Sequence, residues 1–425
     1  MERMESKDIF ALALGLNGTP WKVDDIVLDT GLGELKISLI FEKGSRFTHP
    51  KSGELCSVYD SRPRRWRHMN FFQYRCYLEA RVPRVDGGEE YGVAQVEVPW
   101  AREGIGFTLL MEAMMVLLAQ SGMTVAEASR TLGIDASTYW RTLGYRVHQA
   151  HEQIEVKEVR KLLVDETSIR KGHEYVTVVC EPGRLEEKKP TRVLFVTEGK
   201  DHQTLEATAA FLKEHGGSAE QIQLVCSDMS PAFKKGFTQY FPDAIQVTDY
   251  FHVVQKIVNT VNDIRLEETK QVPELLKQTK YLWIKKENKL SSGQKKRLYR
   301  LCDYKLKTAK AHMILAAFQD LLMAKDFEEA LSGLKWWYFW ATHSRIPQII
   351  KAAKEIRANC WEGLINYLKY RLTNAAAEAM NGLIQAAKRK SRGFRNFSYF
   401  RTAIYLLGSR LKFNLPSPIP ATHTN

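Results

Sequence analysis

The sequence lacks any apolar run long enough to cross a bilayer, although 44% of its 425 residues are hydrophobic. Its first ten residues, MERMESKDIF, include acidic side chains where a secretory signal would carry only bases. We therefore expect no membrane partner and a cytoplasmic location. The length suggests about two to four domains.

Paired cysteines are also missing. The six cysteines are scattered and no two form a CxxC pair, so the sequence indicates neither a disulfide framework nor a standard zinc site. Cys180 and Cys226 fall within apolar, strand-like stretches. A thiol in that setting is most simply a core residue.

Acidic residues are absent from residues 379–425, which contain eight bases. Residues 251–425 hold 31 Lys and Arg against 13 Asp and Glu, a balance of +18. Residues 1–250 hold 31 against 36, a balance of −5, which gives the net charge of +13. Because a solvated helix face normally mixes both signs, this segregation favours a polyanionic partner.

What is present begins with acids that follow apolar strands. A strand at 162–166 carries Asp165 and Glu166 at its end, a strand at 221–227 is followed by Asp228, and a strand at 244–248 by Asp249. Adjacent strands would bring these ends into one crevice. Carboxylates gathered there repel one another unless a cation lies between them, so the pattern predicts a divalent metal.

The elements around these acids indicate a mixed sheet, as in RNase H-like nucleases. The predicted order is strand 162–166, strand 174–180, strand 191–198, helix 202–215, strand 221–227, helix 231–240, strand 244–248 and a helix from 250 onward. His252 follows Asp249 by one helical turn. It could belong to the acidic site or cap or pack the helix.

A long helical, basic and aromatic stretch, residues 260–360, follows. Residues 291–293 (SSG) predict a connector within it. The WWYFW cluster at 336–340 is expected in the core, and a stacking platform for nucleobases is the alternative. The α/β core is expected to resume at 373–397, where Glu378 and Asn381 share one face of a helix. Glu378 could instead be a simple helix-dipole residue.

Two N-terminal segments have the chemistry of nucleic-acid contacts. Residues 61–72, SRPRRWRHMNFF, place Arg64, Arg65 and Arg67 around Trp66, either to bind phosphate or as a solvated basic turn beside a strand at 73–85. Residues 123–143 predict a helix-turn-helix around Gly133. Its second helix would offer a DNA groove the following polar side chains: Ser137, Thr138, Tyr139 and Arg141.

With Asp165, Asp228 and Glu378 identified, the chain resembles the ISL3 family of bacterial insertion-sequence transposases. The matching stretches are VDETSIRKGHEYVTVV (164–179), SDMSPAF (227–233), TDYFHVVQ (248–255) and TNAAAEAMNGLIQAAKRKSRGFRNFSYFR (373–401). The resemblance implies an RNase H-like domain with an Asp-Asp-Glu triad at these three positions and a helical insertion before the Glu. It further implies DNA cleavage and strand transfer at inverted-repeat ends.

The resemblance also implies cofactors and partners. Asp165, Asp228 and Glu378 would hold two Mg²⁺ or Mn²⁺ ions, with Asp249, His252 and Asn381 beside them. The partners would be double-stranded DNA and a second copy of the chain, in a nucleoid-associated protein. Flanking DNA would contact four basic side chains of the segment without acids, residues 379–425: Lys388, Arg389, Arg392 and Arg395.

One departure from the family concerns zinc. The family usually carries a cysteine cluster ahead of the RRWRH motif, whereas residues 48–60 contain only Cys56 and residues 85–92 contain no cysteine. We therefore do not expect a structural zinc ion.

The expected architecture is α/β, with a β-rich region and a helix-turn-helix preceding an RNase H-like core that an all-helical insertion interrupts. The expected domains are 1–105, 106–155, 156–259, 260–360 and 361–425, the last with the basic tail. Two alternatives stay open: a domesticated DNA-binding regulator with a non-catalytic core, and a nuclease without strand transfer. The acidic triad argues against the first, and the second leaves the helix-turn-helix unexplained.

Overall fold

The computed structural model describes residues 5–170, 174–184, 186 and 188–418. The chain forms two compact units, Met1–His151 with Leu411–Asn425, and Glu152–Arg410. We call them the first and second unit. Within the described residues, no helix combines the length and the apolar character needed to span a membrane.

The first unit opens with a mixed sheet in the order β1-β2-β5-β4-β3, with β6 paired to β5. Alternating side chains fill its core, where Trp21 and Trp66 pack edge to face against Trp100. The elements are α1 (Ser6–Ala13), β1 (Trp21–Asp29), β2 (Glu34–Phe41), β3 (Arg46–Thr48), β4 (Leu55–Arg67), β5 (Arg75–Asp86), α2 (Gly88–Tyr91) and β6 (Val93–Gln95). The basic residues 61–67 thus lie within β4, and the alternative of a solvated basic turn is wrong.

Three helices follow the sheet in the first unit: α3 (Leu109–Gln120), α4 (Val125–Leu132) and α5 (Ala136–Glu152). Thr124 caps α4, and Gly133 ends it in the left-handed conformation with φ 65°. The hydroxyl of buried Tyr139 donates to the carbonyl of Met115, which ties α5 to α3. The predicted helix-turn-helix is present, although Tyr139 belongs to its core and is not available to a groove.

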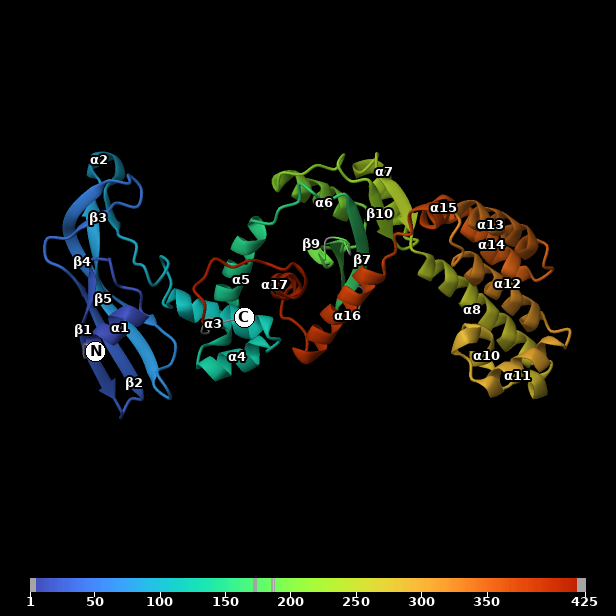
Figure 1. Cartoon of the computed structure of the whole chain (residues 1–425), viewed down its shortest axis with the longest axis horizontal. Coiled ribbons are helices and arrows are strands. Elements are labelled where there is room, and N and C mark those ends of the chain that lie inside the picture. Colours follow the sequence, from blue (N-terminus) through green and yellow to red (C-terminus); the bar gives the residue numbers. More distant parts are fainter. Residues whose placement is uncertain (1–4, 171–173, 185, 187, 419–425) are drawn as a thin grey trace. The chain divides into compact units, whose positions relative to one another are not determined.

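The second unit is built on a mixed sheet in the order β11-β10-β7-β8-β9 (Figure 1). β7 and β8 pair antiparallel, as do β8 and β9, whereas β10 runs parallel to both β7 and β11. The elements are β7 (Lys161–Arg170), β8 (Glu174–Glu181), β9 (Arg192–Glu198), α6 (Gln203–Glu214), β10 (Leu224–Ser227), α7 (Pro231–Tyr240), β11 (Ile245–Thr248) and α8 (Tyr250–Thr269). The predicted order of elements is confirmed.

One strand differs from its expected length. β7 continues to Arg170, so Asp165 and Glu166 lie inside the strand and not at its end. The added residues, Thr167 to Arg170, are mostly polar and gave no strand signal. They are held in the sheet because Thr167 and Ser168 pair with β8.

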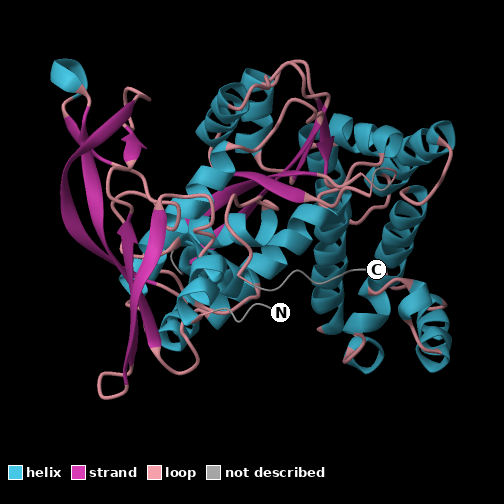
Figure 2. Cartoon of the chain, turned by 60° about the vertical axis from the view of Figure 1, so that its left-hand side comes forward, coloured by secondary structure: helices cyan, strands magenta, loops and turns pink. Residues whose placement is uncertain are grey.

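Helices alone follow α8 until the chain returns to the sheet (Figure 2). They are α9 (Pro273–Leu276), α10 (Lys280–Ile284), the short 3₁₀ turn η1 (Glu287–Lys289), α11 (Ser292–Cys302), α12 (Lys307–Leu321), α13 (Phe327–Thr342), α14 (Pro347–Asn359) and α15 (Trp361–Tyr370). Ser291 is the N-cap of α11, and Ser292 and Gly293 are its first residues, so only Ser291 of the predicted connector lies outside a helix. The aromatic cluster is only partly core: Trp337 is buried, but Trp336 and Phe339 are 57% and 60% exposed.

The chain then returns through α16 (Ala375–Lys390) and α17 (Phe397–Gly408). α16 lies alongside β7 and α17 packs on β9 (Figure 1). Gly408 permits the second contact, because a Cβ there would lie 2.4 Å from Cγ2 of Val193. The buried hydroxyl of Tyr405 accepts a hydrogen bond from the backbone N–H of Val196.

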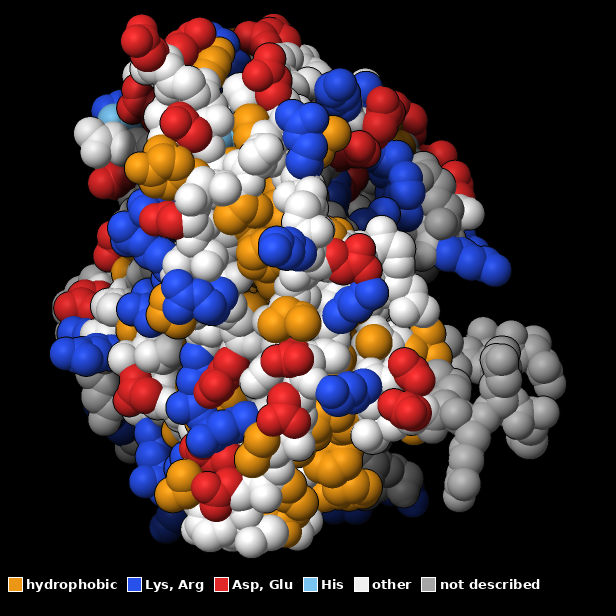
Figure 3. Space-filling model, turned by 90° about the vertical axis from the view of Figure 1, so that its left-hand side faces the viewer, with side chains coloured by type: hydrophobic (Ala, Val, Ile, Leu, Met, Phe, Trp, Pro, Cys, Tyr) orange, Lys and Arg blue, Asp and Glu red, His pale blue; other side chains and the backbone are white. Residues whose placement is uncertain are grey.

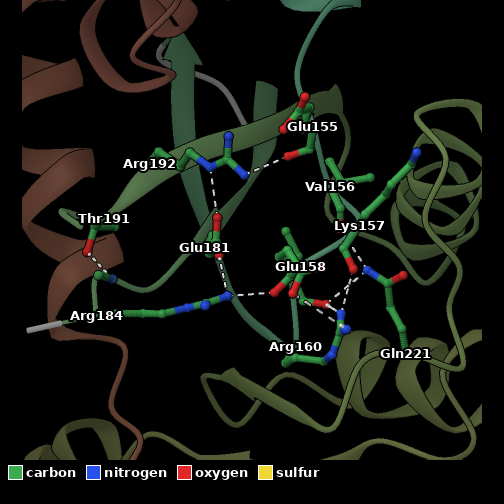
Figure 4. A network of polar contacts seen from close by, with 12 residues as sticks. Glu155, Val156, Lys157, Glu158, Arg160, Glu181, Arg184, Thr191, Arg192 and Gln221 are labelled. Atoms are coloured by element: carbon green, nitrogen blue, oxygen red, sulfur yellow. Dashed lines mark hydrogen bonds and ion pairs between the residues drawn. The ribbon is translucent and has the colours of Figure 1, made fainter. Parts of the chain in front are cut away.

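The start of β7 is fixed by a polar network at residues 155–160 (Figure 4). Glu181 on β8 forms ion pairs with Arg184 at 3.2 Å and with Arg192 at 2.8 Å. Arg192 also donates to the carbonyl of Glu155, and Gln221 donates to the carbonyls of Val156 and Val159. These contacts anchor the strand that carries Asp165.

Candidate active site

The strand register places three acids at the same level of the sheet. In the parallel ladder Leu163 of β7 pairs with Cys226 of β10, and Cys226 pairs with Val247 of β11. Asp165, Asp228 and Asp249 each lie two residues beyond these partners. The three acids therefore follow the paired part of the ladder, Asp165 within β7 and Asp228 and Asp249 just after β10 and β11.

Asp165 is held in place from two sides. Its Oδ1 accepts the backbone N–H of Glu166 at 2.9 Å, and its Oδ2 accepts the amide of Asn381 on α16 at 2.8 Å. Burial raises the pKa of the Asp165 carboxyl, and the charges of Asp228 and Glu378 raise it further. That influence shows that the acids from β7, β10 and α16 share one electrostatic environment.

Asp249, His252 and Glu378 form a closer group, since one candidate ligand atom from each lies within 4.8 Å of the others. Nε2 of His252 is 3.5 Å from Oε1 of Glu378 and 3.9 Å from Oδ2 of Asp249. Burial raises the pKa of Asp249 and of Glu378, and the charge of Asp249 adds to the rise at Glu378. The imidazole of His252 opposes both increases in pKa.

Asp228 lies just after β10, where its Oδ1 accepts the backbone N–H of Ser230 at 2.9 Å. A cavity of about 440 Å³ opens beside it, lined by residues of α7, β11 and α15 that include Lys234, Gln246 and Asn366. Asp228 therefore faces open space on one side.

The chemistry of this group suits a hard cation. Among the described residues, Asp249, His252 and Glu378 each offer a ligand atom within 4.8 Å of the others, and Oδ2 of Asp249 is buried without a hydrogen-bond partner. Carboxylate oxygens are the preferred ligands of Mg²⁺ and Mn²⁺. A bound cation would also offset both causes of the raised pKa values of Asp165, Asp249 and Glu378, which are burial and then repulsion between the acids.

The predicted arginines of β4 differ in their surroundings. Arg67 is buried, and its guanidinium donates to the carbonyls of His68 and Cys76, so in this structure it stabilises the hairpin. Arg65 lies 2.8 Å from Glu34 and 3.2 Å from Glu79. Arg64 is half-buried. Figure 3 views the molecule from the side of the N-terminal sheet and shows Lys and Arg side chains mixed with Asp, Glu and apolar side chains.

The other predicted DNA contacts are more open. Ser137 and Arg141 are exposed on α5 and Thr138 is half-buried. Arg389, Arg392 and Arg395 are exposed at the end of α16 and beyond it. Lys388 is different, because its ammonium donates to the carbonyl of Ser168 on β7.

Sequence reasoning missed two residues that border this site. Asn374 is fully buried and its amide donates to the carbonyl of Val164 at 3.0 Å. Gln385 donates to Oγ1 of Thr167 at 2.7 Å and to the carbonyl of Ser168 at 3.0 Å. Their place on the face of Asn381 was the available signal, since positions three or four residues apart share a helix face.

Comparison with known proteins identifies the family. A family model described as "Transposase" matches residues 162–404, which include all the acids of the site and more than half of the chain. The protein is thus a DNA transposase. A second model, the helix-turn-helix domain of transposase family ISL3, matches residues 96–143. The chain belongs to the ISL3 family of insertion-sequence transposases, as the resemblance indicated.

Two curated relatives cover most of the chain. The transposase for insertion sequence element IS1001 of Bordetella parapertussis is 25% identical over 357 residues, 81% of this chain and 84% of the relative. The transposase for insertion sequence element IS1557 of Mycobacterium tuberculosis is 26% identical over 383 residues, 81% of this chain and 82% of the relative.

A third family model, the zinc-finger of transposases IS204, IS1001, IS1096 and IS1165, matches residues 55–86. These residues form β4 and β5, which carry Cys56 and Cys76. The expectation that this chain holds no zinc therefore has no support from the comparisons.

Proposed function

We propose that this transposase cuts and joins DNA with a divalent-metal site held by Asp165, Asp228 and Glu378. The observation that carries the proposal is that Asn381 on α16, the helix of Glu378, donates to Asp165 on β7 at 2.8 Å, and that β10, which Asp228 follows, pairs with β7 up to Leu163. Two Mg²⁺ or Mn²⁺ ions would activate the attacking hydroxyl and stabilise the leaving oxygen of the phosphodiester.

The residues of the chain itself supply position and charge. Asn381 orients Asp165 through its 2.8 Å hydrogen bond, and the Ser230 N–H orients Asp228. His252 lies between Asp249 and Glu378, so that it can keep both carboxyl groups in place and donate to a phosphate oxygen. The β7 to β11 sheet with its flanking helices supports an RNase H-like core with α9 to α15 inserted before Glu378.

DNA would contact both units. The helix-turn-helix would read the transposon ends through Ser137, Thr138 and Arg141 on α5. Three basic side chains that follow the catalytic Glu would bind phosphates: Arg389, Arg392 and Arg395. Arg64 would add a contact from β4. Because transposition joins two ends, we propose that at least two copies of the chain act together on DNA, at the nucleoid.

The test is a cleavage assay on transposon-end DNA in Mg²⁺. We expect Asp165→Asn, Asp228→Asn and Glu378→Gln each to abolish cleavage and to leave DNA binding in a gel-shift assay intact. Full activity in any of the three would refute the assignment. A pre-cleaved end with a free 3′-hydroxyl should give a joined product, whereas a nuclease without strand transfer would give none.

A further inference from the structure

Among the described residues, no strand pairs with one edge of β7 beyond Leu163. β10 pairs with β7 only from Lys161 to Leu163, and β10 itself ends at Ser227. β8 pairs with the opposite edge as far as Arg170. Carbonyls of alternate residues point to the same edge of a strand, so those of Val164, Glu166 and Ser168 face the side that β10 has left.

Side chains of α16 and its N-cap take over this edge. Asn374 donates to the carbonyl of Val164, Asn381 to that of Glu166 at 3.3 Å and Gln385 to that of Ser168 at 3.0 Å. Lys388 donates to the carbonyl of Ser168 at 2.7 Å. The three alternate carbonyls of the open edge are thus each satisfied by a side chain, as buried backbone groups require.

The two repeats match in length. Four residues of an α-helix rise about 6.0 Å, and two residues of a strand span about 6.6 Å. Asn381 and Gln385 are four apart, and their acceptors Glu166 and Ser168 are two apart. Gln385 also donates to Oγ1 of buried Thr167 at 2.7 Å, which gives it two acceptors on β7.

We propose that Gln385 is a positioning residue of the transposase reaction. It fixes the register of α16 on the open edge of β7, and through the helix it sets where Glu378 and Asn381 meet Asp165. The inference rests on the proposed metal-dependent function of those acids. A slip by one residue would move Glu378 by about 1.5 Å and turn it by about 100°, which is enough to disrupt a metal site.

Gln385→Met tests the proposal because it keeps side-chain length and helix propensity but removes both donors. We expect its cleavage rate at saturating DNA to fall about tenfold or more. The Mg²⁺ concentration for half-maximal rate should rise, and the affinity for end DNA should stay unchanged. Gln385→Lys restores a donor of similar reach and should recover most of the rate. Ala386→Gln, on the exposed face of the same helix, is the matched control.

The acceptor side gives a second measurement. Thr167→Val removes one acceptor at constant shape, so it should raise the Mg²⁺ requirement less than Gln385→Met does. The double variant should be no worse than Gln385→Met alone. Additive losses would contradict a shared contact.

Two results would overturn the proposal. One is Gln385→Met with the wild-type rate and Mg²⁺ requirement. The other is a joint loss of melting temperature and DNA affinity with an unchanged Mg²⁺ requirement, which would make Gln385 purely structural. Glu378→Gln in the same assay separates the proposed function from the positioning role. If Glu378→Gln retains cleavage, the proposed function fails. If Glu378→Gln is inactive while Gln385→Met is fully active, only the positioning role of Gln385 fails.

Discussion

His252 and Glu378 face each other from α8 and α16, with Nε2 of the imidazole 3.5 Å from Oε1 of the carboxyl group. Burial and the charge of Asp249 raise the pKa of Glu378, and His252 opposes that rise. The imidazole of His252 thus lies beside two acids, because Oδ2 of the buried Asp249 is 3.9 Å from the same Nε2. The folded chain holds more negative than positive groups at this point.

This imbalance predicts that Asp249→Asn stabilises the metal-free protein. Burial raises the pKa of Asp249, so the folded state binds its proton more tightly than the unfolded state does. The ionised carboxylate therefore lowers the free energy of unfolding at neutral pH, and a pKa that is higher by one in the folded state corresponds to about 1.4 kcal/mol. That loss is removed as the pH falls through the folded-state pKa.

Thermal melts in a chelating buffer from pH 4 to pH 8 are the measurement. Asp249→Asn should melt higher than the wild type at pH 8, and the difference should shrink toward pH 4. Asp263→Asn, at an exposed position of the same helix α8, should melt like the wild type. An Asp249→Asn variant that melts below the wild type at pH 8 would contradict the prediction.

Added divalent metal should reverse the order of the two melting temperatures, so that the wild type melts above Asp249→Asn. Mg²⁺ or Mn²⁺ that binds only the folded chain stabilises it by about 2.7 kcal/mol at a concentration one hundred times the Kd. We expect the melting temperature of the wild type to rise with metal and that of Glu378→Gln to rise less. Ca²⁺ and a monovalent salt of equal ionic strength control for screening. If metal raised the melting temperatures of Asp165→Asn and Glu378→Gln as much as that of the wild type, the ion would bind elsewhere.

The sequence predicted the sheet of the second unit well because its strands are apolar runs. Residues 174–180 were expected in a strand, and β8 is Glu174–Glu181. The extension of β7 was missed because Thr167 and Ser168 are polar, and only pairing with β8 and the donors of α16 keep them extended. Such long-range partners leave no periodic signal.

The candidate site shows the same limit. Asp165, Asp228 and Asp249 follow apolar stretches and could be named from the sequence, and Glu378 from its motif. The sequence placed Gln385 on the helix face of Asn381 but could not indicate its acceptor, because Thr167 is 218 positions away. The exposure of Trp336 was not predicted, although consecutive aromatic residues on a helix point in different directions and some of them must face outward.

The helix-turn-helix depends on a buried charge. Glu112 on α3 is fully buried and lies 2.9 Å from Nε of Arg102, and it also pairs with Arg146 of α5. Removing one partner of a buried ion pair typically costs about 3–5 kcal/mol. We expect Glu112→Gln to lower the melting temperature and to abolish specific binding to transposon ends.

The control for Glu112→Gln is Glu103→Gln, a nearby exposed acid. Its melting temperature should stay within the error of the wild type, since exposed substitutions usually change stability by about 0.5 kcal/mol or less. Specific end binding by Glu112→Gln at wild-type affinity would contradict the role given to this ion pair.

The two proposed DNA surfaces should respond differently to substitution. Arg141 is exposed on α5, the helix expected to read base edges, so Arg141→Ala should lower affinity for the transposon end far more than for random DNA, by about 1–3 kcal/mol.

Arg389 is exposed near the end of α16 and is expected to contact phosphates. Arg389→Ala should weaken both DNAs equally and reduce the slope of log affinity against log salt by about one. Binding titrations between 50 and 200 mM salt, roughly the range over which phosphate contacts act, measure both effects. Lys354→Ala, an exposed base on α14, is the matched control. If Arg141→Ala weakens end and random DNA equally, α5 does not read the sequence of the transposon end.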